Sequence, residues 1–579
     1  MKMKKRLSQN IVHRLRNREL MDIKPRTSKH YTNRCFYQNI FPNMSVINID
    51  KPPCFLRKFT PDGKYLIAFS NDQSSLHVYT YQGPAVANEL LEKINIEGDF
   101  VGGERSRLDE SAFIQANIFS HFFKLKHIVN LTSNYERLNR ECSLFTNDSR
   151  YVIVASSATI NDQVFPSYYD VLRNNESMSV NIRFFLEDFC IYLIDMVKGK
   201  KCDQLIFKTD YIILSHNQGL YLHDDTLAVL SIQHQTIHIY HIVDSSTTGK
   251  KFLLINSIGR FCFEDDYFVI SSPFEEVNSI SPPSSSSFAS PNSTASSSSS
   301  SSSSSLTARA TSPDPAFHEV FISALKHRFL AFLYRRAHKE SQTTGNVHPL
   351  VNYHRKFEHY LSLRMSKMQL LDKDHLLIKY EVNESITSRL LDNHNLSSYF
   401  VAYQISTATI LQIYENNSNE LLQIFENFCD YFRNTHSYVC SAGNNVYART
   451  IAQRFKKLLT RDGGPTEATR RILSLLPISA QSYTPCPYLD LSLFSYDDRW
   501  VTPMERPKSC GEYPIRFYSR DDGSLRFKIH ADHQHNDSPS ALRLVAFSFH
   551  PYDPFALSIQ RTNSDFVVNL HIRHVPQRL

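Results

Sequence analysis

The chain reads Phe59-Thr-Pro-Asp-Gly-Lys-Tyr65 near its start, and the same pattern returns as Phe145-Thr-Asn-Asp-Ser-Arg-Tyr151 and Phe494-Ser-Tyr-Asp-Asp-Arg-Trp500. Each copy has a phenylalanine, an Asp-centred turn, a basic residue and an aromatic that opens a run of strand-forming residues. Asp bonds its own backbone in turns, and β-branched and aromatic residues favour pleated strands. A degenerate fourth copy is Phe549-His-Pro-Tyr-Asp-Pro-Phe555. Unrelated β-turns are the alternative, but recurrence of the flanking residues favours a repeat that begins propeller blades.

Spacing and composition indicate that such a propeller is irregular. The first two copies start about two blades of 40–45 residues apart, whereas the last two are closer together. Glycine is scarce at 15 residues and there is one tryptophan, so the recurring Gly-His and Trp-Asp dipeptides of regular WD repeats are missing. We predict a mainly β fold with inserted α-helices, in the form of a diverged, irregular β-propeller-like (WD-repeat-like) body.

Length and charge set the class of protein. A chain of 579 residues with 41% hydrophobic residues can bury a large core or a few smaller ones. Its net charge is +7, from 64 basic and 57 acidic residues, which is a weak field over this length. The charge alone therefore does not predict nucleic-acid binding.

The ten cysteines stand apart from one another and from histidines at zinc-ligand spacing. They predict reduced core residues rather than a RING-type zinc site or a redox pair, and we expect no metal and no cofactor. The N-terminus lacks an apolar signal core, and no run reaches 18 apolar residues. We therefore expect the protein in the nucleus, with the cytoplasm as the other possible compartment.

A serine tract around Ser281–Ser305 divides the chain. Such a stretch buries no apolar surface, so we predict disorder across 279–312. It could be an interdomain linker, but strand patterns on both sides favour an insertion into one body, formed by 23–278 and 313–579. Before the tract, short strands are predicted at 151–155, 191–195, 205–215, 227–232 and 236–240. After it, helices are predicted at 321–338, 419–433 and from 467 to Pro477, with strands at 376–380, 399–405, 544–549 and 566–572.

The N-terminal segment 1–22 differs from the rest. Asn10–Met21 could form three helical turns, with Asn10 as N-cap and Ile11, Leu15 and Val12 on one face. A helix this short is marginal alone in water, so it should order only when docked. The residues leave open whether it docks on its own body or on another protein.

The chain contains none of the common enzyme signatures. A phosphate-binding G-x-x-x-x-G-K-[ST] loop, a G-x-G-x-x-G loop, H-E-x-x-H and G-x-S-x-G are all missing. Acidic pairs such as Asp224–Asp225 fall at predicted turns, where neighbouring carboxylates are normally solvated. We predict no catalytic residue and no enzyme activity.

Long blocks of the chain resemble the De-etiolated-1 family. They are Arg137–Thr146, Leu214–Leu222, Ile258–Asp266, Pro477–Tyr483, Tyr488–Asp498, Met504–Pro507, Pro514–Tyr518 and His550–Asn563. The resemblance extends from about Gln9 to Arg573, and departs at the serine tract and around Ile94–Ile114.

The resemblance implies a non-catalytic scaffold or substrate-recruiting subunit of a cullin-4 RING E3 ubiquitin ligase, which promotes degradation of transcription regulators. Implied partners are the damaged-DNA-binding adaptor protein, a small associated helical protein, the constitutive-photomorphogenic RING ligase and a ubiquitin-conjugating enzyme. Asn10–Leu15 resembles the family's adaptor-binding helix, so the expected contacts are Ile11, Val12, His13, Arg14 and Leu15. The alternative is a chromatin- or histone-binding propeller that acts as a transcriptional repressor.

Overall fold

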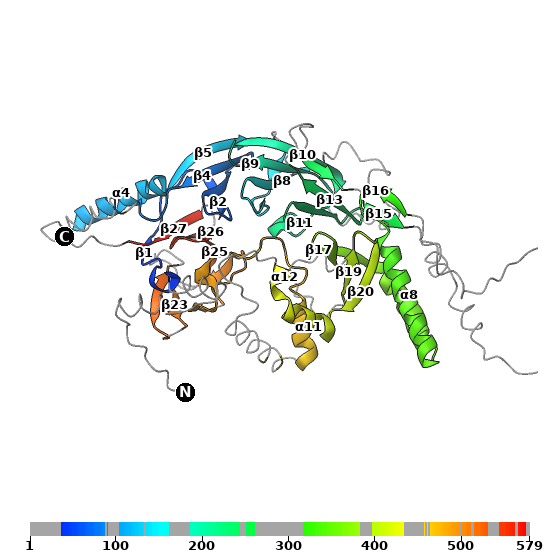
Figure 1. Ribbon diagram of the computed structural model, residues 1–579. Coiled ribbons are helices and arrows are strands. Elements are labelled where there is room, and N and C mark those ends of the chain that lie inside the picture. The colour runs from blue at the N-terminus through cyan, green and yellow to red at the C-terminus, as the bar shows by residue number, and fades with distance from the viewer. Residues whose placement is uncertain are drawn as a thin grey trace, which may run out of the picture.

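Figure 1 shows the computed structural model of the protein, in which several antiparallel sheets are joined by helices. The structure describes residues 36–574, except for 87, 89, 91–103, 133–134, 161–185, 244–250, 256, 261–315, 383–396, 434–456, 458–459, 461–463, 498, 511–513, 521, 531–542 and 562–565. The prediction of a mainly β chain with helices between its strands is confirmed.

Three sheets follow one another in the first part of the chain. The first sheet contains β2 (Cys54–Phe59), β3 (Tyr65–Ser70), β4 (Ser75–Tyr81) and β5 (Phe123–Asn130), and helix α4 (Glu104–Phe122) precedes β5. The second contains β6 (Arg137–Leu138), β7 (Leu144–Phe145), β8 (Tyr151–Thr159), β9 (Glu187–Asp195) and β10 (Lys200–Asp210). The third, after the short η1 helix (Ser215–Asn217), contains β11 (Leu220–His223), β12 (Thr226–Ser231), β13 (Thr236–Ile242) and β14 (Phe252–Leu254).

A two-stranded hairpin brackets the serine-rich region. It consists of β15 (Ser257–Arg260) and β16 (Ala316–Glu319), with Arg260 opposite Ala316. The chain therefore enters and leaves 261–315 at neighbouring points of one hairpin.

The second part of the chain alternates sheets with helices. Helices α8 (Leu325–Thr344) and α9 (His348–Ser362) precede the fourth sheet, which contains β17 (Leu363–Leu370), β18 (His375–Val382), β19 (Tyr399–Gln404) and β20 (Thr409–Glu415). After it come α11 (Asn419–Asn427), α12 (Cys429–Arg433), a helix over 464–473 and the short η2 helix (Pro487–Leu489). The fifth sheet contains β21 (Phe494–Ser495), β23 (Ile515–Ser519) and β24 (Leu525–Ile529).

The last sheet joins the two ends of the described chain. Strand β1 (Met44–Val46) pairs with β27 (Phe566–Ile572), followed by β26 (Ala556–Arg561), β25 (Arg543–Phe549) and β22 (Lys508–Cys510). We call it the closing sheet, because residues more than 500 positions apart hydrogen-bond within it, as in the pair of Ser45 and His571. This pairing places both ends of the described chain in one sheet.

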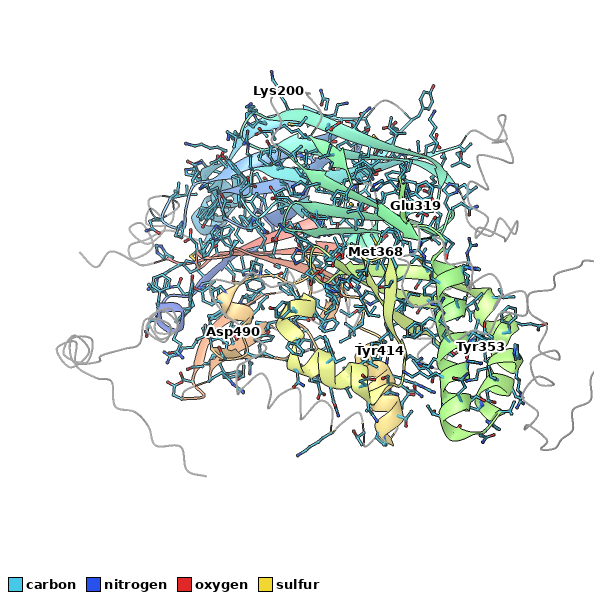
Figure 2. The ribbon with its side chains drawn as sticks, turned by 45° about the vertical axis from the view of Figure 1, so that its right-hand side comes forward. Lys200, Glu319, Tyr353, Met368, Tyr414 and Asp490 are labelled. Carbon is cyan, nitrogen blue, oxygen red and sulfur yellow. The ribbon has the colours of Figure 1, made fainter. Side chains whose placement is uncertain are left out.

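Neighbouring sheets share apolar cores, which explains why many strands are buried on both faces. Leu66 of β3 lies in one core with Leu557 of the closing sheet, while Ile67 lies in another core with Val152 of the second sheet. A larger core joins the second, third and fourth sheets and includes Phe329 of α8, whose ring stacks on Tyr380 at 5.0 Å. Figure 2 shows Tyr353 on the α8–α9 pair at one side of the molecule and Met368 of the fourth sheet nearer its middle.

The strands and helices predicted within the described residues are confirmed with local corrections, and the helix predicted at Asn10–Met21 lies outside those residues. The helix predicted at 321–338 is α8, which begins at Leu325 and ends at Thr344. The strand predicted at 205–215 ends at Asp210, and the helix predicted at 419–433 is divided at Phe428 into α11 and α12. The third copy of the repeat is the larger correction, because Arg499 and Trp500 lie in a turn that opens no strand. There Trp500 N donates to Asp497 O at 3.0 Å, which continues the turn.

A buried histidine near the pairing of β1 with β27 gives a pH prediction. His571 is fully buried, with Nδ1 at 2.8 Å from Ser45 Oγ and Nε2 at 3.0 Å from Ser558 Oγ. Burial, with a smaller contribution from His530, lowers the pKa of His571 from 6.5 to about 3. Below pH 6.5 the unfolded chain takes up a proton that the folded chain refuses, so stability should fall as the pH drops toward 3.

The expected loss from His571 is about 2 kcal/mol at about pH 5 relative to pH 7.5. Denaturant unfolding of the protein and of His571→Gln at the two pH values measures it. The variant should show a smaller pH dependence by that amount, and an equal pH dependence in both proteins would contradict the assignment.

Candidate functional site

The predicted adaptor-binding residues Ile11, Val12, His13, Arg14 and Leu15 lie outside the residues that the structure describes. Their role therefore stays a prediction. The serine tract at 279–312 lies outside the described residues as well. The described part of the molecule instead brings together the repeated turns and several of the blocks that carry the family resemblance.

The first two copies of the repeat form the same hairpin turn. Thr60 Oγ1 donates to Asp62 Oδ1 at 2.5 Å and accepts from Tyr65 N at 3.1 Å. In the second copy, Thr146 Oγ1 donates to Asp148 Oδ1 at 2.5 Å and accepts from Tyr151 N at 3.0 Å. The Thr-x-Asp spacing thus closes both turns by the same side-chain bonds, as expected for Asx-type turns.

The fourth copy reaches a similar turn with a histidine. His550 N donates to Phe555 O at 2.9 Å, and His550 Nδ1 accepts from Asp553 N at 2.7 Å. Since Nδ1 accepts, the neutral ring carries its proton on Nε2, which donates to Gly63 O at 2.9 Å. Burial lowers the pKa of His550, in keeping with this neutral form.

These turns touch one another in sheet order. The closing sheet contacts the first sheet through the hydrogen bond between His550 and Gly63. The first sheet contacts the second through Asp62 N, which donates to Ser149 Oγ at 3.2 Å. The second sheet contacts the third through Asn147 Nδ2, which donates to Asp224 Oδ1 at 2.7 Å. We call this row of contacts the turn row.

A cavity of about 160 Å³ lies against the turn row. Pro61, Asn147, Asp224 and Pro551 line it from the turns, and other walls come from Lys58 and Glu505. Lys58 is 8% exposed, and burial lowers its pKa, while the Glu505 carboxylate at 3.8 Å opposes that shift. Glu505 also accepts from Arg57 Nη2 at 3.2 Å, so its charge is shared by two cations of β2.

The segment 477–485, which we call the crossing segment, forms the other wall of this cavity through Gln481, Tyr483, Thr484 and Pro485. Gln481 pairs with Phe145 through both amide atoms, accepting from Phe145 N at 2.9 Å and donating to Phe145 O at 2.6 Å. The carbonyl of Ala480 accepts from Asn217 Nδ2 at 3.2 Å. The segment is thereby attached to the second sheet and to the η1 helix before the third.

Gln369 fixes the start of the crossing segment to the fourth sheet. It is fully buried on β17, and its Oε1 accepts from Ile478 N at 2.9 Å. Its Nε2 donates to Tyr221 Oη at 3.3 Å and to Phe432 O. One amide therefore joins the third sheet, the fourth sheet, α12 and the crossing segment.

The contacts around this cavity join segments that are far apart in the chain. Among the described residues, no group of three or more His, Cys, Asp or Glu side chains could hold a metal ion. Burial raises the pKa of Cys142 and of Cys486 to about 12, so both keep their protons. None of the seven described cysteines forms a disulfide. No helix in the described part of the chain is long and apolar enough to cross a membrane.

Sequence reasoning did not single out Asn217, Gln369, Gln481, Glu505 or His550. Four of them had a signal, because Leu214–Leu222, Pro477–Tyr483, Met504–Pro507 and His550–Asn563 are blocks that carry the family resemblance. Those blocks meet around one cavity. Gln369 lies in none of them, and only its buried contacts reveal it.

The comparisons with known proteins agree with this resemblance. The family model of De-etiolated protein 1 matches residues 140–574. The chain is 30% identical to "Light-mediated development protein DET1" of Arabidopsis thaliana, over 98% of this chain and 99% of that protein. It is 28% identical to the protein of the same name from Solanum lycopersicum, over 97% of this chain and 99% of that one.

A solved structure, the acylaminoacyl peptidase of Pyrococcus horikoshii, is similar over 34% of this chain and 24% of its own, with 13% identity and a TM-score of 0.19. A score this low carries no argument about the fold, so the assignment rests on the sequence matches. The chain belongs to the De-etiolated protein 1 family.

Proposed function

We propose that this protein is a non-catalytic scaffold and substrate-recruiting subunit of a cullin-4 RING E3 ubiquitin ligase. It promotes ubiquitination and proteasomal degradation of transcription regulators, and acts in the nucleus. The observation that carries the proposal is membership of the De-etiolated protein 1 family, with similarity to plant DET1 proteins along almost the whole chain.

The body that would serve as the scaffold is, in this proposal, a diverged propeller whose sheets are its blades. Three features support it: consecutive antiparallel sheets share cores, their turns meet in the turn row, and β1 pairs with β27 to join the two ends. The crossing segment would then lie at the centre and lock the blades in place. Such a body suits a scaffold because its faces keep fixed relative positions.

The proposed partners are the damaged-DNA-binding adaptor protein, the small associated helical protein, the constitutive-photomorphogenic RING ligase and a ubiquitin-conjugating enzyme. The physical effect is positional. A body that holds a substrate module and a charged conjugating enzyme raises their effective concentration, without contributing a reacting group of its own.

Docking on the adaptor is assigned to the N-terminal helix, with Ile11 and Leu15 as apolar anchors and Arg14 as a polar contact. Anchors of this kind contribute about 2 kcal/mol or more each when buried in a partner's groove. Ile11→Ala combined with Leu15→Ala should therefore weaken adaptor binding by about 4 kcal/mol, or several hundredfold.

Co-precipitation of the adaptor with full-length protein, with a form that begins at residue 23 and with the double variant tests this assignment. Val351→Ala with Leu411→Ala is the matched control, since both side chains are exposed aliphatics of the body. Equal recovery of the adaptor by all forms would refute the N-terminal assignment. Retention on nucleosomes without any adaptor would favour the chromatin-binding alternative.

A further inference from the structure

One outer edge of the body gathers lysines from two neighbouring sheets. Strand β5 is the edge strand of the first sheet and β10 is that of the second. The two sheets meet where His127 Nε2 lies 3.0 Å from Val197 O, in the turn between β9 and β10. These strands lie together along the upper rim in Figure 1, and Lys200 stands at the top of the molecule in Figure 2.

Many of the exposed positions of this edge are basic. We call it the lysine edge; its exposed basic residues are Lys124, Lys126, Lys198, Lys200, Lys201 and Lys208. Lys126 Nζ also donates to Tyr65 Oη at 2.8 Å, and Lys201 Nζ donates to Gln204 Oε1 at 3.1 Å. The others extend from exposed positions of the strands and the turn.

Most carboxylates of the same strands are engaged within the protein, and the exception is Glu187 of β9, which is half-buried. Asp195 and Asp210 are buried, and Asp195 accepts from Val197 N and Lys198 N at 2.9 and 3.0 Å. Asp203 accepts from Lys251 N and Phe252 N at 2.8 and 2.9 Å. Along β5, β9 and β10, all of whose residues are described, no Asp or Glu is exposed. The lysine edge therefore has more exposed lysines than accessible carboxylates on its own strands.

Aliphatic side chains are interleaved with the lysines. Leu125, Ile128, Val197 and Ile206 are 50%, 53%, 55% and 59% exposed. A nucleic-acid backbone would pair its phosphates with the lysines but would offer little apolar surface to the aliphatic side chains. Single-stranded nucleic acids are usually held by stacking of their bases on aromatic side chains. A protein segment that alternates acidic and apolar residues matches both features, and edge strands are common docking sites for extended peptides.

We propose that the lysine edge binds an extended acidic segment of a partner protein, in which carboxylates meet the lysines and apolar side chains cover Leu125, Ile128, Val197 and Ile206. This binding goes beyond the ligase assignment and does not depend on it. It also differs from simple edge protection, in which lysines only prevent edge strands from pairing with other chains.

The test uses full-length protein and three fluorescent probes: a peptide alternating Glu and Val, the same peptide with Lys in place of Glu, and a duplex DNA. Fluorescence anisotropy measures each affinity at low and at physiological salt. The variant combines Lys124→Glu, Lys200→Glu and Lys208→Glu. Its matched control combines Lys356→Glu, Lys373→Glu and Lys528→Glu, which changes the net charge equally at exposed lysines elsewhere.

We expect the Glu-Val peptide to bind and the Lys-Val peptide not to bind. The edge variant should bind the Glu-Val peptide at least about tenfold more weakly than the unaltered protein, and the control variant less than about twofold more weakly. The affinity of the unaltered protein for this peptide should fall as the salt concentration rises. If the duplex DNA bound more tightly than the Glu-Val peptide, and the edge variant lost this binding, the proposal would be overturned in favour of nucleic acid. Lack of peptide binding, or equal loss in both variants, would overturn it as well.

Discussion

Replacing Gln369 by leucine should lower the free energy of unfolding by about 3 kcal/mol, because it leaves buried backbone groups without partners. Ile478 N loses its acceptor and Phe432 O loses a donor, and Tyr221 loses a contact in the third sheet. Each unpaired buried group costs about 1–3 kcal/mol, and leucine is close enough in size to leave packing as a smaller effect.

Chemical denaturation of Gln369→Leu measures this loss. The matched control is Gln423→Leu, which places the same change on an exposed position of α11 and should alter stability by less than about 0.5 kcal/mol. Equal stability of the two variants would contradict the idea that the crossing segment is held by this amide.

Replacing Gly63 by alanine should lower the free energy of unfolding by more than the cost of the positive φ alone. Gly63 has φ +73°, a conformation that costs alanine about 1 kcal/mol or more. A Cβ there would also lie 2.5 Å from His550 Nε2, in the contact that joins the closing sheet to the first sheet. Displacing the His550 ring breaks its bond to Gly63 O and should add about 1–3 kcal/mol.

Gly523→Ala separates the two effects. Gly523 has a similar φ of +69°, but a Cβ there meets nothing within 4 Å. It should therefore show the backbone cost alone, and the difference between the two variants measures the contact of Gly63 with His550. A difference near zero would show that the two turns are not coupled in this way.

Local patterns in the sequence predicted much of this fold. The Asp-centred pattern of the first two copies identified two turns, and their side-chain bonds agree to within 0.1 Å. Runs such as 227–232 and 399–405 became strands because their β-branched and aromatic residues can be buried on both faces. In these cases the signal and the structure involve the same few residues.

The rest depends on partners far away in the chain. Trp500 follows an Asp-centred turn, as Tyr65 does, yet no strand begins at Trp500. In the first copy β2 pairs with β3, the strand that begins at Tyr65, whereas β21 before the third turn pairs with the more distant β23. Gln481 looks like any polar loop residue until it meets Phe145, 336 positions away. Such contacts leave no periodic pattern, so the crossing segment and the cavity could not be predicted from spacing.

The proposed role as a scaffold within a cullin-4 ubiquitin ligase can be tested by native mass spectrometry of the affinity-purified protein, because the masses identify the bound subunits. We expect a complex that contains the damaged-DNA-binding adaptor and the small helical protein, and that loses both when residues 1–22 are removed. Recovery of the protein with histones and without the adaptor would contradict it.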